Sequence, residues 1–187
     1  YTNAGTYTVV MTGIYPHFVI NNNTTSRDKI LSVEQWGNQQ WESLERSFWG
    51  CSNLVINATD TPDLSNVTSL DWMFYEGTAM VDNGGAMKNW DTSNVQQMER
   101  MFRNASSFNS DIGNWEVSNV QTFNQMFQNA SSFDQSLADW NIGSATNMGG
   151  IFRNSGVSKE NYDATLIGWA TISGGETIPL DINLSNT

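Results

Sequence analysis

Hydrophobic positions recur along this chain with a period of about 25 residues. Residues 91–115 read DTSNVQQMERMFRNASSFNSDIGNW, and residues 116–140 repeat the pattern as EVSNVQTFNQMFQNASSFDQSLADW. The phenylalanine in the middle of this unit recurs at intervals of 25 to 28 residues, at Phe48, Phe74, Phe102, Phe127 and Phe152. A period of this length is typical of solenoid proteins, in which each repeat stacks on its neighbours.

Each repeat carries the signals of a short strand followed by a short helix. A tryptophan among apolar residues, as in the segment from Ile112 to Val117, predicts the strand. Residues 93–96 then have the spacing of a helix capping box. The apolar residues that follow share one helical stripe, at Val95, Met98, Met101, Phe102 and Ala105. We therefore predict an α/β solenoid of about five to six 25-residue coils over residues 31–157, with one short parallel strand and one short helix in each coil.

Glycine or asparagine closes four of the five predicted helices, and Glu76 stands at this position in the second repeat. The position two residues after the phenylalanine is Gly50 in the first repeat and asparagine in the last three. Glycine and asparagine both tolerate the left-handed backbone conformation, which commonly ends a helix. The sequence therefore predicts a left-handed residue at this point of the repeat.

The two ends of the chain depart from the repeat. Residues 6–21 are rich in β-branched and aromatic side chains, interrupted by Gly13 and Pro16, and predict two strands joined by a turn. We expect residues 1–30 to form an N-terminal β-hairpin cap, because a terminal repeat cannot bury both of its faces alone. Residues 158–187 are expected to form a partial last coil and a C-terminal edge element. The whole is expected to be one domain of a larger protein.

Composition and charge narrow the possible functions. The net charge of −11 argues against nucleic acid, because neutralising phosphates requires clustered basic side chains. His17 is the only histidine and Cys51 the only cysteine, so the chain has no histidine-based catalytic arrangement and no disulfide framework. We expect no enzyme activity and no cofactor, with calcium binding left open. No apolar run is long enough to cross a membrane, so no membrane insertion is expected, and we expect a monomer.

Two departures from the repeat are candidate binding features. Trp49, Trp72 and Tyr75 occupy outward-facing positions where the later repeats carry arginine, glutamine or glycine. They are predicted either to bind a ligand, since aromatic anchors dominate binding hot spots, or to serve as the landing site of the hairpin. The repeat between Phe74 and Phe102 is also three residues longer than the 25-residue unit, around residues 81–85, and this gives either a binding loop or a neutral insertion.

The recurring Ser-Asn-Val, Met-Phe and Asn-Ala-Ser-Ser-Phe motifs, followed by tryptophan, resemble those of BspA-type leucine-rich-repeat surface proteins. The same repeat occurs in mycoplasma lipoproteins and in surface proteins of Bacteroidetes. The resemblance covers about residues 31–170 and implies a leucine-rich-repeat-like solenoid. It also implies a secreted or surface-anchored bacterial protein with a role in adhesion or partner binding.

Three functions from different classes remain open. The leading hypothesis is a non-enzymatic adhesion or interaction module, outside the bacterial cell, that binds an extracellular protein or glycan. The second is a structural spacer in a large surface protein. The third is a carbohydrate-binding module attached to an enzyme. Exposure of Trp49, Trp72 and Tyr75 favours the first or the third, whereas burial of all three under the hairpin favours the second.

Overall fold

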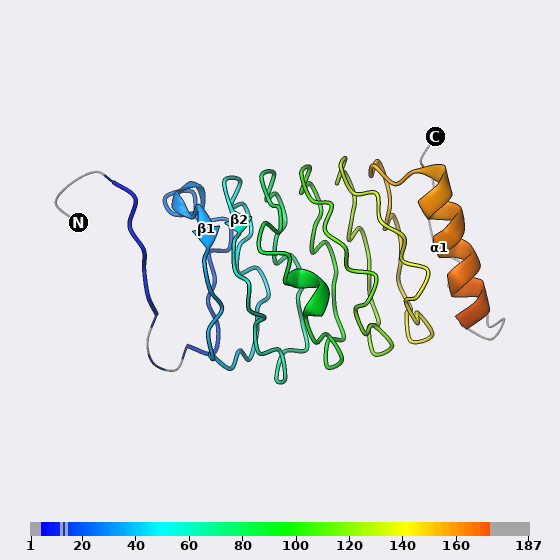
Figure 1. Cartoon of the computed structure of the whole chain (residues 1–187), viewed down its shortest axis with the longest axis horizontal. Helices are drawn as coiled ribbons and strands as arrows, with labels where there is room; N and C mark the ends of the chain where they lie inside the picture. Colours follow the sequence, from blue (N-terminus) through cyan, green and yellow to red (C-terminus); the bar gives the residue numbers. More distant parts are fainter. Residues whose placement is uncertain (1–4, 12, 14, 173–187) are drawn as a thin grey trace.

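The computed structural model describes residues 5–11, 13 and 15–172, and it consists mainly of irregular turns. Its regular elements are η1 (Arg27–Lys29), β1 (Ser32–Val33), β2 (Val55–Ile56), η2 (Met87–Asn89) and α1 (Lys159–Ile172). Figure 1 shows successive turns of the chain side by side along the long axis, with the N-terminal segment at one end and α1 at the other. The two strands pair in parallel, with Ser32 opposite Val55 and Val33 opposite Ile56.

The predicted α/β solenoid of repeated strand-plus-helix coils is wrong. The described chain contains one α-helix and one sheet of two strands, each two residues long. Elsewhere the repeats contact one another through isolated parallel bridges, as at Gln97, which is bridged to Ser69 on one side and to Thr122 on the other. No strand and no helix lies between β2 and α1 except the three residues of η2.

The helices are absent because their backbone amides bond to the next repeat. In residues 98–104, which were predicted to be helical, the N–H groups of Met98, Arg100, Phe102 and Asn104 donate to carbonyl oxygens 24 residues further on, at 2.8 to 3.0 Å. An α-helix needs those same amides for bonds to the carbonyl four residues earlier. Bonding between repeats therefore replaces bonding within a helix.

Two left-handed residues in each repeat also interrupt any helix. Arg100 and Asn104 have φ of 54° and 61°, and their equivalents in the next repeat, Gln125 and Asn129, have 55° and 61°. The left-handed conformation predicted two residues after the phenylalanine is confirmed, although it closes a turn rather than a helix. The other left-handed residue lies inside the predicted helix, where the helical stripe gave no sign of it.

The core is a row of aromatic rings that runs from repeat to repeat. The five repeat phenylalanines stack in order, with centroid distances of 5.7 to 6.0 Å between neighbours. The tryptophans are tied in by hydrogen bonds as well, since Trp115 and Trp140 donate their indole N–H to the carbonyl oxygens of Met87 and Ile112 at 2.8 and 3.0 Å. Each repeat therefore completes its core with side chains of its neighbours.

The two ends of this core are covered in different ways. The predicted N-terminal β-hairpin is wrong, because no β-strand lies among the described residues before Ser32. Instead, Ile20 and Asn22 donate their amides to the first repeat, and Phe18 packs on Phe48 at 5.5 Å. At the far end α1 places Trp169 on Phe152 at 6.1 Å. The expected C-terminal edge element falls in residues 173–187, outside the described part of the chain.

Candidate functional site

The three aromatic residues singled out in the sequence form one cluster. Trp49 lies 5.1 Å from Trp72 and 5.6 Å from Tyr75, and Trp72 lies 4.9 Å from Tyr75, all measured between ring centroids. All three side chains are half-buried. They meet because Trp49 and Tyr75 hold the same position in neighbouring repeats, while Trp72 precedes Tyr75 by three residues on the same turn, at a left-handed φ of 59°.

Three arginines surround these rings. Arg46 lies over Trp49 and Trp72 at 6.0 and 5.8 Å from the ring centroids, and Arg100 lies over Trp72 at 4.5 Å. Arg103 lies over Tyr75 at 5.5 Å. A guanidinium group within about 6 Å of an aromatic face is attracted by the ring quadrupole. The six side chains are referred to below as the aromatic–arginine cluster: Trp49, Trp72, Tyr75, Arg46, Arg100 and Arg103.

Polar side chains contact all three arginines. Arg46 pairs with Glu45 at 3.4 Å, and Arg100 pairs with Glu99 at 3.1 Å. The next repeat adds an uncharged acceptor, because the Gln125 side-chain oxygen accepts from Arg100 Nε at 2.7 Å and from Arg103 Nη1 at 3.1 Å. The cluster therefore spans three repeats and contacts a fourth.

A half-buried carboxylate lies behind the cluster. Asp71 Oδ1 accepts the Glu99 backbone N–H at 2.6 Å. Burial raises the pKa of Asp71 to about 6, and the nearby carboxylates of Glu99 and Glu45 act in the same direction, whereas the hydrogen bond from Glu99 and the charge of Arg46 oppose it. This carboxyl group gains or loses a proton in mildly acidic solution, next to Trp72.

Sequence reasoning missed the arginines and misplaced one glutamine. It treated arginine and glutamine at these positions as a plain outer face, whereas Gln128 is only 7% exposed. The available signal was the alignment itself, because Arg46 and Arg100 share a repeat position with Trp72, and Arg103 shares one with Trp49 and Tyr75. Residues at equivalent positions of adjacent repeats become neighbours in the structure. The alignment could therefore have predicted the contacts between these arginines and the aromatic rings.

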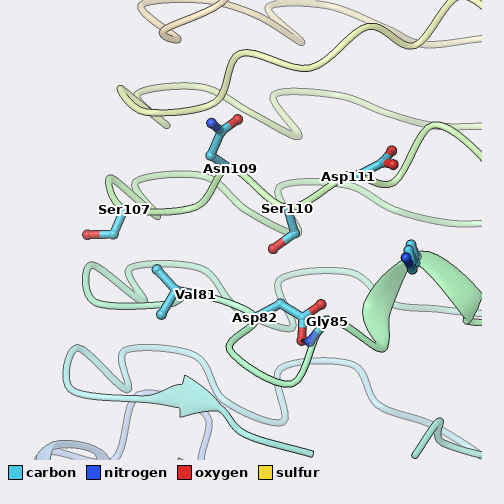
Figure 2. Close-up of a pocket in the computed structure, with 8 residues that line it drawn as sticks. Val81, Asp82, Gly85, Ser107, Asn109, Ser110 and Asp111 are labelled. Atoms are coloured by element: carbon cyan, nitrogen blue, oxygen red, sulfur yellow. Dashed lines mark hydrogen bonds between the residues drawn. The ribbon is translucent and has the colours of Figure 1, made fainter. Parts of the chain in front are cut away.

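The lengthened repeat forms a second surface feature. Val81, Asp82 and Gly85, together with Ser107 and the segment 109–111, line an open hollow of about 370 Å³, which Figure 2 shows between two adjacent turns. Both carboxylate oxygens of Asp82 already accept backbone amides within the loop, from Gly85 and Met87 at 3.0 Å each. The carboxylate therefore shapes the loop.

The remaining candidate residues for metal binding or catalysis are few in the described part of the chain. No group of three histidine, cysteine, aspartate or glutamate side chains in this part of the chain could hold a metal ion. His17 donates from Nε2 to the Glu45 carbonyl oxygen at 2.9 Å, and Cys51 is fully buried. Among the same residues no helix has the length and apolar character needed to span a membrane.

Comparison with known proteins gives one match. No curated protein and no solved structure matches the chain. A family model described as a mycoplasma protein of unknown function, DUF285, matches residues 42–165, from the first repeat into α1. The match supports the predicted relation to mycoplasma repeat proteins, whereas the finer BspA-type leucine-rich-repeat identity stays a prediction. Because the matched segment covers most of the chain and nearly all of its repeats, the protein belongs to the DUF285 family.

Proposed function

We propose that this chain is a non-enzymatic interaction module at the bacterial cell surface, which binds an extracellular protein or glycan through the aromatic–arginine cluster. The observation that carries the proposal is the convergence of three aromatic rings and three guanidinium groups on one half-buried patch, with ring contacts of 4.9 to 5.6 Å. Tryptophan, tyrosine and arginine are the residue types that most often dominate binding energy at interfaces.

The fold does not require aromatic residues at these positions. In the fourth repeat the equivalent positions carry Gln125 and Gln128, and the repeat phenylalanine beside them, Phe127, is still fully buried. A repeat can thus complete its core with polar residues on this turn. The concentration of aromatic rings in the first two repeats therefore favours a role in binding.

A structural spacer is the second candidate, and the continuous backbone bonding between repeats favours it. Neighbouring turns are linked at residues 46, 48 and 50 in the first repeat and at the equivalent residues of the later ones. Such a ladder resists bending and needs no ligand. The two functions differ in whether the purified domain binds anything.

The test is binding of the purified chain to an array of glycans and extracellular-matrix proteins. A triple variant, Trp49→Ala with Trp72→Ala and Tyr75→Ala, should lose the binding that the wild type shows. Removing the exposed apolar side chains of Val9, Val10 and Met11 in a control variant should leave that binding unchanged. Circular dichroism checks that both variants are folded.

Two results would contradict the proposal. A wild type that binds no component of the array would favour the spacer. A folded triple variant that binds as well as the wild type would place the contact surface elsewhere. If the triple variant is unfolded, Tyr75→Ala alone, which leaves both indoles in place, is used under the same criterion.

A further inference from the structure

Two guanidinium groups of the cluster converge on a single uncharged oxygen. Arg100 Nε and Arg103 Nη1 donate to the Gln125 side-chain oxygen at 2.7 and 3.1 Å. The amide oxygen carries only a partial negative charge, whereas a carboxylate or sulfate in the same place would add a full negative charge and could bind the guanidinium groups through two oxygens. The two arginines therefore hold an acceptor position that is filled by a weaker partner than they could take.

The local charge leaves this position positive. Glu99 pairs with Arg100 at 3.1 Å, whereas Arg103 makes no ion pair with any described residue. Arg103 Nε is moreover buried and has no hydrogen-bond partner among those residues. No carboxylate among the described residues therefore neutralises the charge of Arg103 by direct contact.

The aromatic rings fix the directions of the two guanidinium groups. Arg100 lies over Trp72 at 4.5 Å, and Arg103 lies over Tyr75 at 5.5 Å. A guanidinium group that lies against a ring keeps its N–H edge free, and it loses less freedom when it binds an anion. The ring faces are thereby occupied, so a ligand meets the arginine edges and the outer edges of the rings.

We propose that the aromatic–arginine cluster recognises an acidic glycan, whose carboxylate or sulfate group replaces the Gln125 side-chain oxygen between Arg100 and Arg103. The sugar ring that carries this group rests against the exposed edge of Tyr75. This inference depends on the proposed function, because it names the ligand class of the same surface.

The backbone around the cluster favours a glycan over an acidic peptide. The amide of Arg100 already donates to Asn124 in the next repeat, and the amide of Arg103 donates to the Arg100 carbonyl. Those groups offer no free sheet edge, and pairing with such an edge is one of the main ways in which extended peptides are bound. Only side chains are presented, which suits a polymer that carries its charges on pendant groups.

The test places the missing carboxylate on the protein itself. Gln125→Glu has nearly the same shape as the wild type and supplies an internal carboxylate to Arg100 and Arg103. The control is Gln121→Glu, which adds the same charge to the same repeat at an exposed residue outside the cluster. A second variant, Gln125→Ala, removes the internal acceptor.

Binding is measured by titrating each protein with polygalacturonate, dextran sulfate, neutral dextran and polyglutamate. We expect the wild type to bind one or both acidic glycans and not neutral dextran. Gln125→Glu should weaken that binding about tenfold or more while its thermal melting shows that it remains folded. Gln121→Glu and Gln125→Ala should retain it. The two acidic glycans separate a carboxylate ligand from a sulfate ligand.

Several outcomes would overturn the inference. If Gln125→Glu binds the acidic glycans as tightly as the wild type does, no anion binds between Arg100 and Arg103. If the wild type binds polyglutamate as tightly as the acidic glycans, it recognises negative charge alone. The inference also falls if the wild type binds neither acidic glycan. If the aromatic triple variant loses a ligand that Gln125→Glu still binds, the proposed function stands and only the acidic-glycan inference is lost.

Discussion

Replacing Phe127 tests the packing on which every repeat depends. Its ring is fully buried and stacks on Phe102, Phe133 and Phe152 at centroid distances of 5.8, 3.9 and 6.0 Å. Truncation of a buried phenylalanine to alanine costs about 3–5 kcal/mol, from lost transfer energy and from the cavity that remains. Because Phe127 contacts rings on both sides, Phe127→Ala should fall in the upper part of this range, while Phe127→Leu, which keeps most of the volume, should cost about 1–1.5 kcal/mol.

The assay is equilibrium unfolding in urea, followed by tryptophan fluorescence and by circular dichroism. A thermal scan should show Phe127→Ala melting roughly 6–20 °C below the wild type. Gln121→Ala, at an exposed residue of the same repeat, is the control and should change the free energy of unfolding by less than about 0.5 kcal/mol. A loss of less than about 1 kcal/mol for Phe127→Ala would refute the aromatic row as the core.

Three further predictions concern polar groups. Trp140→Phe removes the indole hydrogen bond to the Ile112 carbonyl oxygen and should lower the free energy of unfolding by about 1–3 kcal/mol in the same assay. An unchanged urea midpoint would show that this hydrogen bond does not stabilise the fold. Burial raises the pKa of Asp71 from 3.8 to about 6, so its contribution to the free energy of unfolding should be greatest below pH 4 and should be lost as the pH rises through 6. Asp71→Asn should abolish this dependence of the unfolding free energy on pH. An identical pH dependence in the variant would exclude Asp71 as its source. Burial also raises the pKa of Cys51 to about 12, so iodoacetamide should label the thiol only after unfolding, and rapid labelling of the folded chain would contradict its burial.

The sequence predicted the buried positions better than the elements that hold them. The repeat phenylalanines and the tryptophans at 115 and 140 are buried, as their recurrence indicated. The same spacing of Val95, Met98 and Met101 also fits one face of a helix, and no helix forms there. A hydrophobic period reports which side chains face inward, but it does not say where the backbone amides bond.

The candidate site was predicted in part, for a similar reason. Alignment of the repeats brought Trp49, Trp72 and Tyr75 to notice, and the structure places them in contact. One of the two predicted roles, a landing site for an N-terminal hairpin, fails because no such hairpin forms, and the rings contact one another and the arginines instead. The role of Gln125 depends on distances between side chains of different repeats, which a sequence alone does not provide.

Bonding between neighbouring turns has a consequence for how such a chain can change in length. Each turn donates a set of amides to the turn after it and accepts a matching set from the turn before it, as Phe102 does with Met126 and Phe74 does with Met101. A duplicated copy of residues 116–140 would carry both the donor amides and the acceptor carbonyl groups at the positions that its neighbours need. Gene duplication can therefore add whole repeats without leaving a buried amide unpaired. Shorter insertions must preserve these bonds, and the three extra residues of the second repeat lie in the loop that leads into η2, where Asn83 and Gly84 still donate to the Ile56 carbonyl oxygen of the preceding repeat.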